Sequence, residues 1–162
     1  DFLRKNLFEP LKLTRTRYDS NAEVLVNRAQ GYAFENDKFG NEALLGMSQP
    51  GAAGALISTA SDLVRWQQAL VSGRVVKPDS YEEMTLPFLL ANGRETGYGM
   101  GLQLDRQAGR PCVWHGGGIN GFNSVLLYFP DQQLHVAAIS NSERLRADAL
   151  GLAIAEACLG SK

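Results

Sequence analysis

The sequence predicts an α+β fold in which an antiparallel sheet is backed by a C-terminal helix and preceded by part of a helical lobe. Three observations support this. Helix signals dominate the first half of the chain, strand-like runs separated by turn residues fill residues 96–141, and a mainly apolar segment closes the chain. We expect residues 1–95 to form a partial helical and loop lobe and residues 96–162 to form the sheet with its helix. Both would be parts of a single truncated domain.

Helix signals mark the first half. Apolar residues at helical spacing over residues 2–8 predict a short helix that ends before Pro10. Residues 59–62, Thr-Ala-Ser-Asp, have the form of a capping box, in which the Thr hydroxyl and the Asp carboxylate satisfy free amides. The helix that follows is expected to bury Trp66 and to end at Gly73. A second helix is predicted over residues 78–86, with proline in its first turn.

The second half has strand signals. Strands are predicted over residues 98–104, 111–115, 122–129 and 134–139, with turns at 107–109 and 130–132. The closing helix is predicted from Ser142 to Leu159, with Ser140 or Asn141 as its cap. Few charges interrupt this helix, so we expect it to lie against the sheet. Alternation along the second strand places Trp114 under the helix and the next side chain on the opposite face.

Composition excludes several classes of partner. The 162 residues are 44% hydrophobic and 20% charged, which is typical of a globular domain. Sixteen basic and seventeen acidic residues give a net charge of −1, so no strong field attracts nucleic acid or an anionic membrane. The longest charge-free stretches, 43–61 and 111–130, are broken by Gly, Pro, Ser and Asn, unlike a transmembrane helix. Two cysteines predict neither a disulfide scaffold nor a structural zinc site.

The densest candidate site is the run His115-Gly116-Gly117-Gly118, at the end of one predicted strand and before the next. Three glycines cost about 0.5–1 kcal/mol each relative to alanine in regular structure. A strand edge without side chains lets a ligand approach the backbone. On these residues alone, a ligand-binding strand edge and a flexible hairpin loop with a surface histidine are equally favoured, because a Gly-rich turn is a weak motif.

Five segments, spread over most of the chain, together carry a more specific pattern. They are Glu9–Thr16, Gly51–Leu63, Tyr98–Gly101, His115–Ser124 and Pro130–Asn141. In this order they resemble the C-terminal motifs of the serine β-lactamase and penicillin-binding protein superfamily, in its class C-like branch of esterases, D-aminopeptidases and β-lactamases. One departure is Lys12, where the family usually has glycine.

The resemblance implies roles for the glycine-rich strand. His115 would help to position substrate or tune the proton network, and Gly117 would line the substrate. The backbone N–H of Gly118 would be one of two oxyanion-hole donors, which stabilise the charge that develops during acyl transfer. Tyr98, Asn120 and Asn123 are further candidates for contact with substrate. Tyr98 is expected to form a pocket wall beside the glycines, whereas Asn120 is equally explained by its tolerance of left-handed backbone.

The sequence contains no Ser-x-x-Lys, no Tyr-x-Asn and no G-x-S-x-G motif. The first two supply the family's catalytic serine, lysine and tyrosine, and in the family they precede the segment resembling residues 1–16. The resemblance therefore implies the C-terminal portion of a longer serine hydrolase of the β-lactamase, DD-peptidase or esterase kind, acting through an acyl-enzyme. Because a serine without an adjacent base is a poor nucleophile, we expect this chain alone to be inactive.

The rival interpretation is a non-catalytic ligand-binding or self-associating module of the same fold, since a truncated sheet would expose apolar surface and favour homo-oligomers. The expected partner is a small-molecule or peptide substrate: a β-lactam, a D-amino peptide or an ester. No cofactor is expected. The family resemblance suggests the bacterial periplasm or export, and the sequence itself leaves the compartment open.

The remaining candidates favour structural roles. His135 lies in an apolar strand and is expected to be a packed histidine rather than a ligand. Cys112 and Cys158 are expected to be two buried free thiols. A metal site built from Cys112, His115 and His135 is disfavoured, because alternation puts Cys112 and His115 on opposite faces of a strand.

Overall fold

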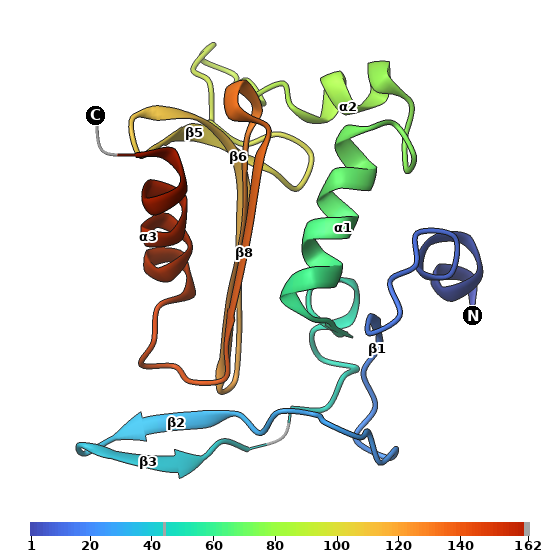
Figure 1. The fold of residues 1–162 in the computed structure, drawn as a ribbon, viewed down its shortest axis with the longest axis vertical. Helices are drawn as coiled ribbons and strands as arrows, with labels where there is room; N and C mark the ends of the chain where they lie inside the picture. Colours follow the sequence, from blue (N-terminus) through green and yellow to red (C-terminus); the bar gives the residue numbers. More distant parts are fainter. Residues whose placement is uncertain (44, 161–162) are drawn as a thin grey trace.

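A four-stranded antiparallel sheet lies between helices in the computed structural model, which describes residues 1–43 and 45–160 (Figure 1). The strands, in sheet order, are β5 (Gln103–Gln107), β6 (Arg110–Ile119), β7 (Phe122–Phe129) and β8 (Leu134–Ser140). Helix α3 (Ala147–Leu159) packs on β7 and β8 from one side and α1 (Ala60–Val71) packs on them from the other. The predicted α+β fold, with an antiparallel sheet and a C-terminal helix, is confirmed. The division at residue 96 stays a prediction, and residues 161–162 of its second part lie outside the described residues.

The remaining elements surround this sheet. They are a π-helical turn (Arg4–Phe8), the paired strands β1 (Arg17–Tyr18) and β4 (Leu56–Ile57), the hairpin of β2 (Tyr32–Glu35) and β3 (Lys38–Asn41), and α2 (Pro78–Met84). The β2–β3 hairpin projects below the sheet in Figure 1. Among the described residues, no helix is both long and apolar enough to span a bilayer.

The hydrophobic core lies between the sheet and α3. The buried residues that form it are Cys112, Val125, Leu127, Phe129, Val136, Ala138, Ala147 and Ala155. Trp114 packs against this core, as predicted from strand alternation. The helix approaches the sheet closely because Gly151 has no side chain. A Cβ atom there would lie 2.5 Å from Cγ1 of Val125.

Of the two hydrogen bonds of the predicted capping box, the one to the Thr59 hydroxyl is present at the N-terminus of α1. The Thr59 hydroxyl accepts a hydrogen bond from the Asp62 amide at 3.3 Å, and Gly73 follows the helix with a φ of +77°. The Asp62 carboxylate does not complete a capping box. It is buried and accepts hydrogen bonds from the Arg15 amide at 2.8 Å and the Thr16 hydroxyl at 3.0 Å. This aspartate therefore fastens the N-terminal segment to α1.

The predicted start of the last helix is wrong. The helix begins at Ala147 rather than Ser142, and neither Ser140 nor Asn141 caps it. Asn141 instead donates from its side chain to the Gln30 carbonyl, and its own carbonyl accepts from the amide of Tyr32 in β2. These contacts tie the segment after β8 to β2, and residues 141 and 143–145 form bends rather than the first turn of the helix. The amide of Ala147 is capped by the side chain of Asn123 from β7, at 2.6 Å.

Two other boundaries also differ from the prediction. Tyr98 forms an isolated bridge with Gln103, Met100 and Gly101 form bends, and β5 begins only at Gln103. Helix α2 ends at Met84, two residues early. The turn at Ala108-Gly109 and the strand Phe122–Phe129 lie where the sequence predicted them.

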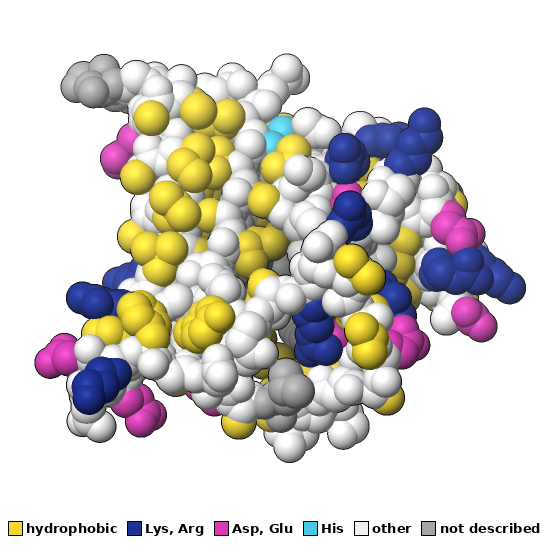
Figure 2. Space-filling model, turned by 60° about the horizontal axis from the view of Figure 1, so that its bottom comes forward, with side chains coloured by type: hydrophobic (Ala, Val, Ile, Leu, Met, Phe, Trp, Pro, Cys, Tyr) yellow, Lys and Arg dark blue, Asp and Glu magenta, His cyan; other side chains and the backbone are white. Residues whose placement is uncertain are grey.

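Exposed apolar side chains gather away from the sheet itself. Figure 2 shows a band of hydrophobic side chains over the side of the molecule where α3 lies. Leu145, Leu150 and Ile154 are each at least 39% exposed there, and residues 86–90 include four more exposed apolar side chains. Among the described residues of the four-stranded sheet, the exposed large aliphatic side chain is Ile139. Self-association through the sheet stays a prediction.

Candidate functional site

Strand β6 changes its surroundings halfway along its length. Its first half pairs with β5 on one side, from Gln107 opposite Arg110 to Gln103 opposite Trp114, and with β7 on the other. From His115 to Ile119, β7 is its one strand partner among the described residues. The three glycines, predicted at the end of a shorter strand, are therefore inside β6, where they form an open edge.

The hairpin register shows where the backbone groups of this edge point. Ile119 and Phe122 flank the two-residue turn Asn120-Gly121, and residues in that position exchange backbone hydrogen bonds with each other. Hydrogen-bonded and non-hydrogen-bonded pairs alternate along an antiparallel ladder. Gly118, opposite Asn123, therefore makes no ladder bond to β7. Its N–H and C=O point away from β7, into the open edge, and those of Gly116 point the same way.

The space around this edge is free of side chains. A Cβ atom built on Gly118 would meet no atom within 4 Å. At Gly117 a Cβ atom would lie 2.9 Å from the hydroxyl oxygen of Ser124, which stands opposite on β7. Glycine at 117 therefore makes room for Ser124, and glycine at 118 leaves the backbone open to a ligand.

Two of the predicted site residues are in direct contact. The hydroxyl of Tyr98 lies 2.8 Å from Nε2 of His115, and the two rings meet edge to face with centroids 5.8 Å apart. The other ring nitrogen of His115, Nδ1, lies 2.5 Å from the carbonyl oxygen of Gly116. Both side chains are exposed at the edge of the sheet. Tyr98, His115 and the glycines of β6 thus form one continuous surface.

Asn120 lies apart from Tyr98 and His115, although it is two residues after Gly118. It is exposed in the β6–β7 turn, five residues after His115, which in a strand is on the order of 16 Å. Asn123, another candidate for substrate contact, has structural partners. Its amide donates to the Ser142 carbonyl at 2.7 Å and accepts from Ala147, so it holds the start of α3 in place.

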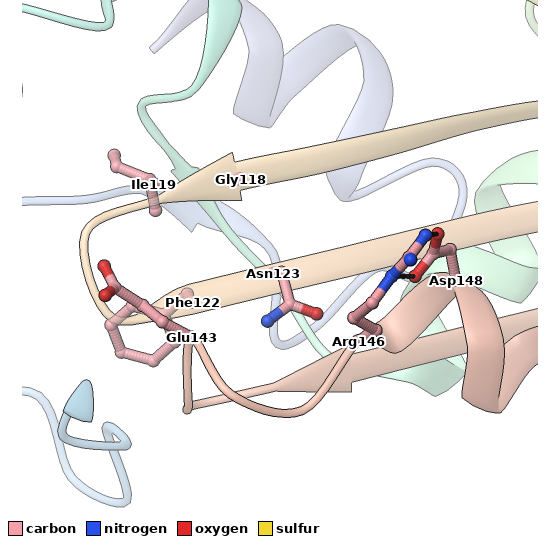
Figure 3. Close-up of a pocket in the computed structure, with 7 residues that line it drawn as sticks. All are labelled: Gly118, Ile119, Phe122, Asn123, Glu143, Arg146 and Asp148. Carbon is pink, nitrogen blue, oxygen red and sulfur yellow. Dashed lines mark hydrogen bonds and ion pairs between the residues drawn. The ribbon is translucent and has the colours of Figure 1, made fainter. Parts of the chain in front are cut away.

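A hollow of about 460 Å³ lies beside the tip of the hairpin, on the side where α3 begins (Figure 3). Its lining comprises Gly118, Ile119, Phe122, Asn123, Glu143, Arg146 and Asp148. Its charged groups already have partners. Arg146 pairs with Asp148 at 2.5 Å and lowers the pKa of that carboxyl, while Glu143 accepts from the Gly121 amide at 3.1 Å. No sequence spacing pointed to this hollow, and it lacks both Tyr98 and His115.

His135 is the packed histidine that the sequence predicted. It lies under α1, where its Nδ1 is 3.1 Å from the side-chain oxygen of Gln67 and its ring stacks on Tyr128 with centroids 4.5 Å apart. Burial lowers its pKa. Among residues 1–43 and 45–160, no three His, Cys, Asp or Glu side chains come together as metal ligands would.

The prediction of two buried thiols is wrong for one of them. Cys112 is buried, and burial raises its pKa to about 12. Cys158 is exposed near the end of α3. The prediction failed because almost the whole of α3 is apolar, including the part of its surface that faces away from the sheet.

Comparisons with known proteins give a family match over almost the whole chain. A family model described as Beta-lactamase matches residues 1–159. The chain is similar to penicillin-binding protein 4* of Bacillus subtilis, at 26% identity over 157 residues that cover 88% of this chain and 35% of that protein. It spans about a third of the length of the curated relatives it matches.

Solved structures share the fold. A D-stereospecific amidohydrolase from Streptomyces sp. superposes with a TM-score of 0.78 at 28% identity, covering 98% of this chain and 48% of that one. The octameric penicillin-binding protein homologue from Pyrococcus abyssi superposes with a TM-score of 0.83, covering 99% of this chain and 37% of that one. At 20% identity, the second likeness shows the fold alone.

Proposed function

Because this chain belongs to the Beta-lactamase family, we propose that it is the portion of a serine hydrolase that supplies a substrate-lining strand and one oxyanion-hole amide. The reaction is acyl transfer through an acyl-enzyme. One observation carries the proposal: the N–H of Gly118 is directed into an open strand edge that has no side chain to cover it, three residues after His115.

The chemistry of acyl transfer explains the need for such an edge. When a nucleophile attacks a carbonyl carbon, the carbonyl oxygen gains negative charge, and fixed N–H donors stabilise it without reorganising. Gly118 supplies one donor, and His115 with Tyr98 belongs to the polar surface that positions substrate and adjusts proton transfer. A second donor and the nucleophile come from elsewhere, because these 162 residues contain no Ser-x-x-Lys and no Tyr-x-Asn.

The proposed substrates are amides and strained amides with an extended acyl part. The D-stereospecific amidohydrolase, 28% identical over 98% of this chain, supports an amide of a D-amino acid or D-amino peptide, and the penicillin-binding relatives support a β-lactam. The outward N–H and C=O groups of Gly116 and Gly118 suit an extended peptide that adds to a sheet edge. A small ester has the same reacting carbonyl and is the third candidate.

Hydrolysis assays test the proposal directly. A chromogenic β-lactam, a D-amino acid anilide and a phenyl ester are incubated with residues 1–162 and with the polypeptide as its source makes it. We expect no turnover by residues 1–162 and turnover of at least one acyl donor by a form that includes a Ser-x-x-Lys segment. If every form binds one of these compounds without hydrolysing any, the non-catalytic binding module is the correct interpretation.

Substitutions at neighbouring glycines separate the oxyanion role from a structural one. In a form that includes a Ser-x-x-Lys segment, Gly118→Pro deletes an N–H that makes no ladder bond, so we expect a folded protein whose kcat falls about 10²–10³-fold. Gly118→Ala keeps the N–H and adds only a Cβ atom in open space, so its kcat should fall far less than that of Gly118→Pro. Gly117→Pro deletes an N–H that bonds to β7 and should lower the melting temperature instead. Full activity in folded Gly118→Pro would remove Gly118 from the mechanism.

A further inference from the structure

Both ring nitrogens of His115 have a partner within the chain, and one of these partners determines the position of the ring proton. The carbonyl oxygen of Gly116, 2.5 Å from Nδ1, can only accept a hydrogen bond. Nδ1 must therefore carry a hydrogen. In the neutral imidazole the other nitrogen, Nε2, then has a lone pair, and the Tyr98 hydroxyl at 2.8 Å donates to it.

We propose that Tyr98 is a positioning residue that holds the imidazole of His115 in one orientation at the open edge of β6. In this orientation Nδ1 faces the Gly116 carbonyl oxygen, which selects the Nδ1–H tautomer. The geometry of this inference comes from the two hydrogen bonds of His115. Its importance for catalysis rests on the proposed function. An exposed histidine at a strand edge would otherwise rotate among several rotamers, and ordering it would cost conformational entropy on substrate binding. The contact with Tyr98 orders the ring before substrate arrives.

The backbone around Tyr98 is shaped to deliver its hydroxyl to this place. Gly97 and Gly101 have φ angles of +68° and +73°, which side chains rarely adopt, so the chain bends on both sides of the tyrosine. Between them, Gly99 presses against the end of α2, where an added Cβ atom would lie 2.1 Å from the Met84 carbonyl oxygen. The Met100 amide donates to the same carbonyl at 3.0 Å. The loop is thus seated on α2, and Tyr98 projects from it to His115.

Nitrogen-15 NMR of the histidine rings tests this inference on the full chain without any substrate. A ring nitrogen that carries a hydrogen and one with a lone pair resonate far apart, so the spectrum reports the tautomer. At alkaline pH we expect His115 to show a protonated Nδ1 and an unprotonated Nε2. Free histidine prefers the opposite tautomer, so Tyr98→Phe should move both His115 signals toward averaged values. His135, held by Gln67, is a second histidine in the same spectrum and should not move.

Two controls separate the hydrogen bond from general structure. Tyr32→Phe removes a hydroxyl from β2 at nearly the same exposure, 37% against 39% for Tyr98, and should leave the His115 signals unchanged. In a catalytically active form, Tyr98→Phe should lower kcat up to about a hundredfold, because the His115 imidazole would no longer be held in its reactive position. Tyr32→Phe should leave kcat unchanged.

The inference fails if wild-type His115 is in the Nε2–H tautomer, or if a folded Tyr98→Phe protein keeps the wild-type His115 signals. If the Tyr98→Phe protein does not fold, the tautomer of His115 in the wild-type spectrum still tests the inference. An Nδ1–H signature that Tyr98→Phe abolishes supports the inference whether or not the protein hydrolyses any acyl donor. Absence of hydrolysis in every form counts against the proposed function and leaves the positioning of the ring established.

Discussion

The two faces of the four-stranded sheet are built from alternate residues of the same strands, yet they differ in how fully a helix covers them. The face under α3 buries Leu127, Phe129 and Val136, each at most 5% exposed. The other face carries His115 and His135, and α1 covers it in part. Because side chains alternate along a strand, one set of residues can stabilise the fold while the next set remains available for polar contacts.

The two histidines differ in how far a neighbouring helix covers them. This difference, rather than the residue type, distinguishes the packed His135 from the candidate site residue His115. They share one face of the sheet, since His135 stands opposite Tyr128 and His115 stands opposite Leu126 on β7. His135 is held under α1 by Gln67 and is half-buried. His115 is exposed where β5 has ended, and its partner Tyr98 comes from a loop. The open end of this face is therefore where chemistry is expected.

The largest expected effect tests the difference between the faces. Leu127 points into the α3 core and is 1% exposed, whereas its neighbour Leu126 is half-buried on the other face. We expect Leu127→Ala to lower the free energy of unfolding by about 2–5 kcal/mol, since it leaves a cavity in a packed core. Leu126→Ala should cost much less, on the order of 1 kcal/mol. Urea denaturation measures both losses. Equal losses would contradict the distinction between a closed face, packed under α3, and an open face, which α1 covers only in part.

The sequence predicted the elements whose signals are local. The strand Phe122–Phe129 is a continuous apolar run between turns, and Thr59 with Gly73 marks both ends of α1. Strand β6 was predicted too short because glycine carries no hydrophobic pattern. Its extended state at residues 116–118 comes from pairing with β7. The start of α3 was missed for a similar reason, since contacts of Asn141 with Gln30 and Tyr32 override the local capping residues.

Of the residues that the sequence singled out for the candidate site, the structure brings Tyr98 and His115 into contact, and the sequence did not predict this contact. Three consecutive glycines after His115 are visible in the sequence, and they indicated a bare strand edge. The hydrogen bond between Tyr98 and His115 joins residues 17 positions apart and depends on how the loop after α2 sits, which no periodicity reports. Substrate contact by Asn120 stays a prediction, since the length of the strand separates the turn that holds Asn120 from His115.

A smaller effect is expected from the pH dependence of stability that His135, the histidine under α1, contributes. Burial lowers the pKa of His135 in the folded state, so the unfolded chain binds more protons in the range just below the ordinary histidine pKa of about 6.5. The stability that this neutral histidine contributes is present above that pH and is lost as the pH falls through the lowered folded pKa. The adjacent phenol of Tyr128 has a raised pKa and stays neutral throughout.

Denaturation at a series of pH values between about 7.5 and 5 measures this dependence. We expect the free energy of unfolding to decrease toward acid in the wild type and to decrease less steeply in His135→Gln. His115→Gln is the matched substitution at the open end of the same face and should keep the part of the slope that His135 contributes. A wild-type slope that His135→Gln leaves intact would show that the acid sensitivity arises elsewhere.

The smallest effect is expected from the two cysteines, because the rate at which each thiol is modified reports whether α3 covers it. Cys112 is buried under α3 with a pKa of about 12, so at about pH 8 only one thiol in roughly ten thousand is ionised. Cys158 is exposed on α3 itself. A thiol-reactive disulfide reagent should therefore modify one cysteine rapidly in the native protein and the second only after unfolding. Cys158→Ser should abolish the rapid reaction. Rapid modification of both thiols in the native protein would show that α3 lifts from the sheet, and the contrast between a closed and an open face would then no longer hold.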